Sequence, residues 1–282
     1  VSKAAECVRL FRDAGDRRGL VAALQHLGRC ALSSGADVER VRPVFDESLR
    51  VAQDLGDQHA IGFALANLAY LVWCQGRRRE SRAMYEAAVA HVRRSGDAMF
   101  TGMLLGALGW YTMVDGDLER ARRYKEEGLA ILRRLDAAEA VGLALLGLAH
   151  LARREGDGAR LRALLEESAP LLHDTGSPAL ADWLTFTGQV EVERGAHAQS
   201  VRLLAAGESD GPRAGSLRTL SYSMPRDERD ACLAAARSAL GEEAFAVAWA
   251  EGAAMPPDRA IACALANAPL APAHLDRTDG ER

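Results

Sequence analysis

The stretch GDAMFTGMLLGALGW, residues 96–110, decides the fold because its features return at a regular interval along the chain. It contains a Gly-Asp pair, two leucines three positions apart (Leu105 and Leu108) and then a small residue, Gly109. Leucines at this spacing form an apolar stripe on one face of a helix. The small residue after them lets a neighbouring helix approach closely. Three further copies and one weaker copy occur: Leu24, Leu27, Gly28; Leu65, Leu68, Ala69; Leu145, Leu148, Ala149; and Leu184, Thr187, Gly188.

Two interleaved series of turn signals separate these copies. The first is Gly15-Asp16, Gly56-Asp57 and Gly96-Asp97, and the same step of about 40 residues continues to Asp136 and Gly176. The second series is Gly35, Gly76, Gly116-Asp117, Gly156-Asp157 and Gly195. Glycine suits the left-handed residue that ends a helix, and the aspartate after it can cap the next helix. Two series with one period predict two helices per repeat, each of about 18 residues.

These helix pairs resemble tetratricopeptide repeats (TPR), although the period is about 40 residues and not 34. The resemblance implies an all-α fold, a right-handed α-solenoid of antiparallel helix pairs with a C-terminal helical cap. We expect five segments: residues 1–14 as the second helix of a truncated or preceding repeat, 15–206 as the TPR-like array, 207–224 as a loop, 225–268 as the helical cap, and 269–282 as a flexible tail.

The C-terminal part carries a narrower resemblance. Residues 240–245 (LGEEAF), Ala248-Trp249, Glu251-Gly252, Met255 and residues 260–265 resemble the end of the helical-repeat region in bacterial LuxR-type and related STAND signal-transduction ATPases. The resemblance implies a sensor and interaction arm of a transcriptional regulator, with an ATPase domain as a partner in the same parent polypeptide. The sequence itself has no phosphate-loop motif and no recognisable helix-turn-helix segment after residue 265.

Composition narrows the class of protein further. Apolar residues make up 49% and charged residues 26%, which is typical of a folded chain. The net charge of -4 argues against direct nucleic-acid binding, which normally needs a basic surface. No apolar run is long enough for a transmembrane helix, and the N-terminal residues do not resemble a secretion signal. The five cysteines include no C-x-x-C pair, so we expect buried thiols in a reducing cytoplasm.

The candidate binding residues come from two columns of the repeat. One residue after the small position, the column is Arg29, Tyr70, Trp110, His150 and Gln189. Four residues after it, the column is Leu32, Trp73, Met113, Arg153 and Val192. In a TPR-like superhelix these positions line the concave groove. We expect the ligand or peptide to contact eight of them: Arg29, Tyr70, Trp73, Trp110, Met113, His150, Arg153 and Gln189.

The residue types suggest what these columns bind. Large aromatic side chains such as Tyr70, Trp73 and Trp110 give contact area at a low cost in entropy. His150 and Arg153 suit a carboxylate or phosphate. The expected partner is therefore a protein, a peptide or a small-molecule effector. The alternative for the aromatic residues is that they pack between helices as core, and for His150 that it is solvated or bonded locally. The loop 207–224 is a candidate internal lid.

Catalytic patterns are missing from the sequence: it has no H-E-x-x-H motif and no nucleophile elbow. Glu126-Glu127 and Glu166-Glu167 are adjacent pairs, and adjacent residues of a helix point about 100° apart. We therefore expect no enzyme activity, no cofactor and no metal. Two other hypotheses stay open, a free-standing TPR-like scaffold that binds a protein partner through its outer face or by self-association, and an enzyme on a helical scaffold.

Overall fold

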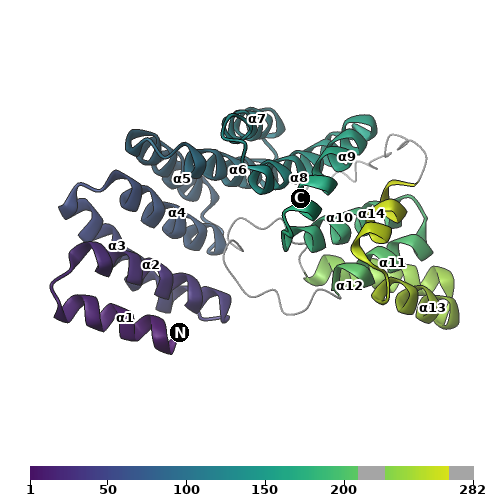
Figure 1. The fold of residues 1–282 in the computed structure, drawn as a ribbon, viewed down its shortest axis with the longest axis horizontal. Coiled ribbons are helices and arrows are strands. Elements are labelled where there is room, and N and C mark those ends of the chain that lie inside the picture. The colour runs from purple at the N-terminus through teal and green to yellow at the C-terminus, as the bar shows by residue number, and fades with distance from the viewer. Residues whose placement is uncertain (209–225, 267–282) are drawn as a thin grey trace, which may run out of the picture. The chain divides into compact units, whose positions relative to one another are not determined.

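The computed structural model describes residues 1–208 and 226–266, and this part of the chain is helical with no strand. Antiparallel neighbours follow one another along the chain, as expected for helix pairs (Figure 1). The helices are α1 (Ser2–Asp13), α2 (Arg17–Ser33), α3 (Val38–Leu55), α4 (Gln58–Cys74), α5 (Arg78–Ser95), α6 (Ala98–Val114), α7 (Leu118–Arg134), α8 (Ala138–Glu155), α9 (Gly158–Asp174), α10 (Ala179–Glu193), α11 (His197–Glu208), α12 (Arg226–Leu240), α13 (Glu242–Ala253) and α14 (Pro257–Leu265).

The described helices fall into two compact units. Unit 1 contains α1 to α7, and unit 2 contains α8 to α14. Within each unit the two helices of a pair, such as α4 with α5 or α10 with α11, pack more extensively than successive pairs do. Five pairs are present, and α1 precedes them as a helix of the second type. The predicted all-α fold built from a two-helix repeat is therefore confirmed.

The predicted turns end the helices as the sequence indicates. Nine glycines of the two series have the left-handed backbone that favours glycine: Gly15, Gly35, Gly56, Gly76, Gly96, Gly116, Gly156, Gly176 and Gly195. Asp136 adopts it in place of a glycine, with φ of 50°. The aspartates then cap the next helix, since Asp57 accepts a hydrogen bond from the Ala60 amide at 3.0 Å and Asp157 from the Arg160 amide at 2.9 Å.

The small residue of the repeat lies where the two helices of a pair cross. A Cβ on Gly28 would come 2.5 Å from the Phe45 ring, and one on Gly109 would come 2.6 Å from Cγ of Lys125. A second small position, which the leucine pattern does not predict, lies seven residues earlier, at Gly62, Gly102 and Gly142. Each of these glycines lies against a branched residue of its own pair, in the order Val92, Leu132 and Leu172. Two small positions two turns apart keep both ends of the crossing close.

The cap consists of α12, α13 and α14, as expected, and it belongs to unit 2. Val201 of α11 forms one core cluster with Ala236, Phe245 and Ala248, and Trp249 stacks on Phe245 with ring centroids 6.0 Å apart. Helix α11 extends to Glu208, so residues 207 and 208 are helical and not part of the predicted loop. The rest of that loop and the predicted tail 269–282 lie outside the described residues.

The prediction of buried thiols is wrong. Cys7 and Cys74 are exposed, and Cys30, Cys232 and Cys263 are partly exposed; all five are free. The repeat gives the reason for Cys7, which lies on the side of α1 that no other described helix covers. Trp183, by contrast, is fully buried, and its indole Nε1 donates a hydrogen bond to Ser168 Oγ at 3.0 Å.

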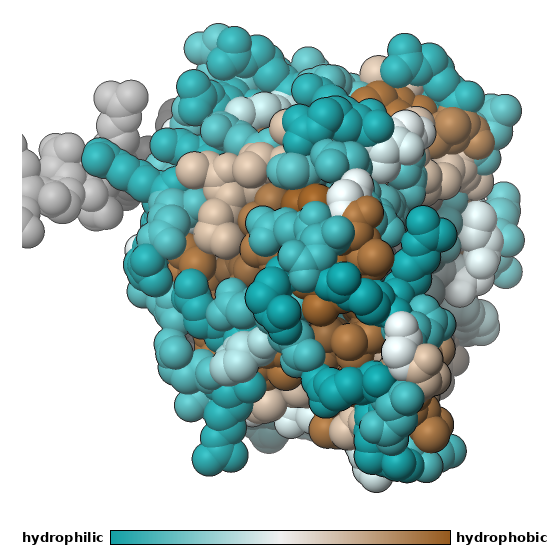
Figure 2. All heavy atoms as spheres, turned by 90° about the vertical axis from the view of Figure 1, so that its left-hand side faces the viewer, coloured by the Kyte–Doolittle hydropathy of each residue, from teal (hydrophilic) through white to brown (hydrophobic). Residues whose placement is uncertain are grey.

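The outer surface is charged but not uniformly polar. Salt bridges link successive second helices, for example Arg12 of α1 with Glu47 of α3 at 2.7 Å, and Arg93 of α5 with Glu127 of α7. On the side that Figure 2 shows, hydrophobic residues reach the surface between hydrophilic ones. None of the helices in residues 1–208 and 226–266 is long and apolar enough to cross a membrane.

Candidate functional site

In unit 1 the first predicted column is half-buried along its whole length. Arg29, Tyr70 and Trp110 each keep part of the side chain accessible. The Arg29 guanidinium lies 5.7 Å from the ring centroid of Phe63 on α4, which is a cation–π distance. Tyr70 and Trp110 pack against the same hydrophobic cluster, whose buried members include Tyr85 and Tyr111.

Trp73 joins this aromatic cluster from the second column. Its ring centroid lies 5.1 Å from that of Tyr111, and Tyr111 stacks on Tyr85 at 4.8 Å. Burial raises the pKa of the Tyr85 phenol well above its usual value, so it stays neutral. Trp73 remains partly exposed. Among the described residues, its Nε1 is buried with no hydrogen-bond acceptor. In this cluster Tyr85 and Tyr111 are buried and fixed by packing, and three rings beside them stay partly accessible. We call these three residues, Tyr70, Trp73 and Trp110, the aromatic patch.

A buried lysine lies beside this patch, and no sequence argument singled it out. Lys125 of α7 is 1% exposed, and its Nζ is 5.5 Å from the ring centroid of Trp110. Desolvation by burial lowers the pKa of this amine to about 7. Comparison between repeats would have found it, because the equivalent positions hold Phe45, Tyr85 and Leu165, all buried.

Met113 does not belong to any accessible surface. It is 1% exposed, so the expectation that it contacts a ligand is wrong. The physical reason is its place on α6, a helix whose 17 residues include no charged side chain and 11 buried residues. A helix that is apolar on all sides is enclosed by its neighbours and leaves few side chains for recognition.

In unit 2 the predicted His150 is largely buried, at 8% exposure. Its ring packs against Phe186 of α10, with centroids 3.7 Å apart. The Arg153 guanidinium lies 5.9 Å from the centroid of the same ring. The structure therefore brings two predicted residues, His150 and Arg153, onto one phenylalanine.

Arg153 already has a carboxylate within the chain. Its Nη2 donates to Glu193 at 2.6 Å, its Nε donates to both oxygens of Glu193 at 3.1 and 3.2 Å, and its Nη1 donates to Gln189 at 3.1 Å. The Gln189 amide in turn donates to Glu228 of α12 at 3.2 Å. The predicted anion site is thus occupied by Glu193. A cap helix, and not the described part of the predicted lid, contacts this column.

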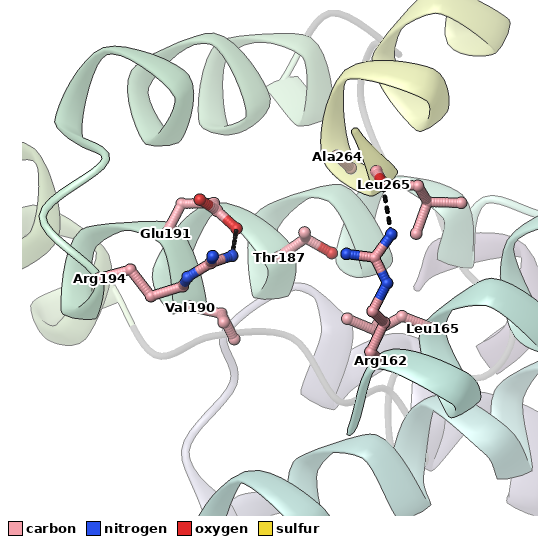
Figure 3. A pocket seen from close by; sticks show the side chains of 8 residues that line it. All are labelled: Arg162, Leu165, Thr187, Val190, Glu191, Arg194, Ala264 and Leu265. Atoms are coloured by element: carbon pink, nitrogen blue, oxygen red, sulfur yellow. Dashed lines mark hydrogen bonds and ion pairs between the residues drawn. The ribbon is translucent and has the colours of Figure 1, made fainter. Parts of the chain in front are cut away.

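A small recess lies elsewhere in unit 2, between α9, α10 and α14 (Figure 3). It encloses about 330 Å³ of non-atom space, which includes open solvent. Arg162 donates to the Leu265 carbonyl at 2.7 Å, and Arg194 pairs with the buried Glu191 at 2.9 Å. Both guanidinium groups that line it are therefore engaged in contacts with the protein.

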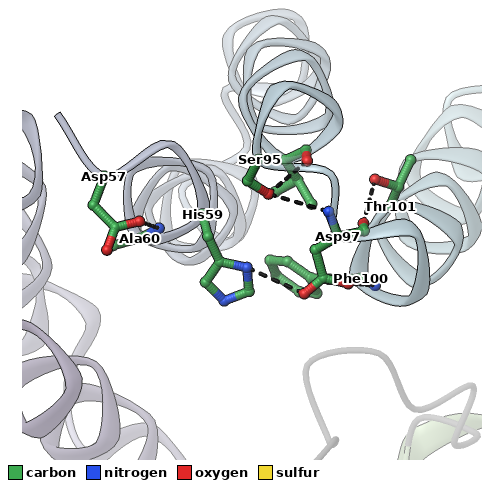
Figure 4. Close-up of polar contacts among 8 residues, drawn as sticks. Asp57, His59, Ala60, Ser95, Asp97, Phe100 and Thr101 are labelled. Carbon is green, nitrogen blue, oxygen red and sulfur yellow. Dashed lines mark hydrogen bonds and ion pairs between the residues drawn. The ribbon is translucent and has the colours of Figure 1, made fainter.

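A polar cluster joins the first turns of α4 and α6 (Figure 4). His59 Nδ1 lies 3.2 Å from Asp97, and its ring is 5.3 Å from Phe100. Asp97 also caps α6 by accepting from the Phe100 amide at 2.8 Å. The cluster links two successive pairs, and each of its contacts is structural. Among the described residues, no three His, Cys, Asp or Glu side chains are placed to hold a metal ion.

Comparison with known proteins defines the fold class. No protein-family model matches the sequence, and no curated protein is significantly similar to it. The helix pairs place the chain among all-α helical-repeat proteins. The crystal structure of BtubC (BKLC) from P. vanneervenii is similar, with a TM-score of 0.57 and 20% sequence identity, over 84% of this chain and 88% of that chain. At this identity the likeness concerns the fold alone.

Proposed function

We propose that the chain is a non-catalytic binding arm whose ligand site is the aromatic patch of unit 1. The observation that carries this proposal is the partial exposure of Tyr70, Trp73 and Trp110 around the buried Tyr85 and Tyr111. Rings that already pack against buried residues lose little conformational freedom when a ligand covers them. Trp and Tyr are also enriched among the residues that dominate binding energy. The ligand is a peptide, a protein segment or a small effector with an apolar group.

The His150–Arg153 region is the less favoured site. A carboxylate or phosphate ligand would have to displace Glu193, which already makes a multidentate contact with Arg153. It would also have to separate Gln189 from Glu228.

The wider role follows from the sequence resemblance of residues 240–265. On that basis we propose that the chain is the sensor and interaction arm of a cytoplasmic bacterial transcriptional regulator of the LuxR-type or STAND class. The full reading frame of the gene tests this: a nucleotide-binding ATPase module encoded directly upstream supports the assignment, and a frame without one contradicts it.

The binding proposal is tested by thermal shift. A library of peptides and small metabolites is screened for compounds that raise the Tm of the chain, since a ligand that binds only the folded state stabilises it by mass action. We expect Trp110→Ala to abolish the shift, because it removes one of the two indole rings of the patch.

The matched control is Trp249→Ala, which removes a half-buried tryptophan from the cap of unit 2 and should leave the shift intact. A shift that persists in Trp110→Ala and in a second variant, Tyr70→Ala, would show that the ligand binds elsewhere.

One observation favours the alternative of a protein scaffold, namely the exposed Leu10 and Phe11 on α1. Light scattering of the purified chain tests self-association. A stable dimer supports the scaffold, and a monomer is the result expected for the binding arm.

A further inference from the structure

Lys3 and Lys125 are the only two lysines of the chain, and arginine supplies the rest of its 35 Lys and Arg residues. Lys3 is exposed, whereas Lys125 of α7 is 1% exposed. The equivalent position in three other helix pairs holds Phe45, Tyr85 and Leu165, which are all buried. Packing at this position does not require an amine, since three pairs are complete without one.

The Lys125 amine lies directly under a residue of the aromatic patch. Its Nζ is 5.5 Å from the ring centroid of Trp110, and Trp110 keeps part of its side chain accessible. The same relation occurs one repeat earlier, where Tyr85 interacts electrostatically with Tyr70, the equivalent of Trp110. A movement of the Trp110 ring would therefore open the amine to a ligand that contacts the patch.

Burial makes this amine a nucleophile. Desolvation lowers its pKa from 10.5 to about 7, so the amine is largely neutral at pH 7.5. A lysine with the ordinary pKa is neutral in about one molecule in a thousand at the same pH. The neutral amine has the lone pair that attacks a carbonyl carbon, and lysines desolvated in apolar surroundings are the ones that form imines in proteins.

We propose that Lys125 forms a reversible imine with an aldehyde whose apolar ring binds at the aromatic patch. The inference rests on the proposed function, because the patch holds the ring while Lys125 reacts. The lone pair of Nζ attacks the carbonyl carbon and a C–N bond forms. Both amine protons pass to the carbonyl oxygen, which leaves as water. The resulting imine is neutral, which suits a site where burial disfavours charge.

The position of the amine indicates where the ligand carries its carbonyl. Aromatic rings that pack together have centroids about 4.5–7 Å apart, and the 5.5 Å between Nζ and the Trp110 centroid falls in the same range. A carbonyl attached directly to the ring therefore reaches the amine without a linker. A carboxylate is a poorer ligand for this amine, because an ion pair would require two charges to be buried.

The test uses the full chain, benzaldehyde and sodium cyanoborohydride, which reduces an imine to a stable secondary amine. Peptide mapping by mass spectrometry then locates the benzyl group. At pH 7.5 we expect Lys125 to be labelled at least tenfold faster than Lys3, although Lys3 is exposed. Benzyl alcohol, which has the same ring and no carbonyl, should slow the labelling because it occupies the patch.

The matched variants are Lys125→Met and Lys3→Arg. Lys125→Met should lose the fast label and keep the helical circular dichroism of the original chain, and Lys3→Arg should keep the fast label. Without the reductant, benzaldehyde should raise the Tm of the original chain by more than benzyl alcohol does. In Lys125→Met the two shifts should be equal.

The inference and the proposed function fail in different ways. Labelling of Lys125 that is absent, or no faster than that of Lys3, overturns the inference. If benzyl alcohol nevertheless raises the Tm and Trp110→Ala abolishes that rise, the aromatic patch stands as the ligand site without an imine. Fast labelling of Lys125 that benzyl alcohol does not slow contradicts the patch as the site of the ring, and the inference falls with it.

Discussion

Lys125 illustrates how one residue can depart from a repeat without breaking it. Its position holds Phe45, Tyr85 and Leu165 in other pairs, and Lys125 is equally buried. The aliphatic part of the side chain packs over Gly109, and the amine is near the face of Trp110. A buried amine is more stable in its neutral form, which is why its pKa falls to about 7.

This residue makes stability depend on pH. In the unfolded chain the amine titrates near 10.5, so between pH 7 and 10.5 the unfolded state binds a proton that the folded state does not. The free energy of unfolding should therefore rise with pH across this window, by at most about 1.4 kcal/mol per pH unit.

The measurement compares urea unfolding of the original chain and Lys125→Met between pH 6 and pH 10.5. Methionine keeps the unbranched shape without the amine, so the variant should be more stable at pH 6 by a few kcal/mol (roughly the integrated pH effect) and should approach the original chain near pH 10.5. The same pH slope in both proteins would assign the titration to another group.

At the scale of the helices, glycine determines how closely the two members of a pair approach. A Cβ on Gly128 of α7 would lie 2.7 Å from the Gly102 carbonyl oxygen and 3.2 Å from Cβ of Leu105 on α6. The first of these atoms belongs to the backbone and cannot move without shifting the helix. The pair therefore depends on the absence of a side chain at residue 128.

We predict that Gly128→Ala destabilises the chain by about 2 kcal/mol or more, the cost of forcing the crossing helices apart. Helix propensity alone acts in the opposite direction, by about 1 kcal/mol in favour of alanine. The control is Ala130→Gly on the exposed side of the same helix, which should cost about 1 kcal/mol from propensity. A higher Tm for Gly128→Ala would contradict the prediction, because it would show that α6 and α7 leave space for a Cβ at residue 128.

The elements differ in how far the sequence predicts them. The turns are predictable because most depend on a local pattern, a left-handed glycine, which a capping aspartate follows at Gly15, Gly56, Gly96, Gly116 and Gly156. The turn at Asp136 follows from the period alone. The sequence predicts an accessible Met113 and a buried Cys7, and both predictions are wrong. The exposure of these residues depends on which helices cover them, and a local pattern does not contain that information. Lys125 could have been found by comparing Phe45, Tyr85 and Leu165 across the repeats. The role of Trp110 in binding stays a prediction.

At the scale of the whole molecule, each of the two units has a hydrophobic core of its own. In unit 1 the core includes Tyr85 and Leu108, and in unit 2 it includes Val201 and Phe245. In repeat proteins stability is approximately a sum of terms within repeats and between neighbours, so a local change need not unfold the entire chain. If the two units unfold separately, each has its own free energy of unfolding, and the changes at Lys125 and Gly128 act on that of unit 1.

The tryptophans allow each unit to be followed separately, since Trp73 and Trp110 belong to unit 1 and Trp183 and Trp249 to unit 2. We predict that Tyr85→Ala, which should cost about 3–5 kcal/mol, lowers the urea midpoint of unit 1 by more than that of unit 2. Unit 1 is read in a Trp183→Phe, Trp249→Phe background and unit 2 in a Trp73→Phe, Trp110→Phe background. Equal shifts in both backgrounds would mean that the units unfold together.

The turn at Gly56 matches the turn at Gly96 in backbone conformation, with φ of 66° and 79°. The intervening residues 57–96 form one complete pair with its own cap and its own ending. An in-frame duplication of that gene segment would therefore join the copies through a turn of the same conformation. Each copy would then pack against a neighbouring helix pair of the same kind. Recombination between such segments can lengthen or shorten the protein by whole pairs, so natural length variation should occur in steps of about 40 residues.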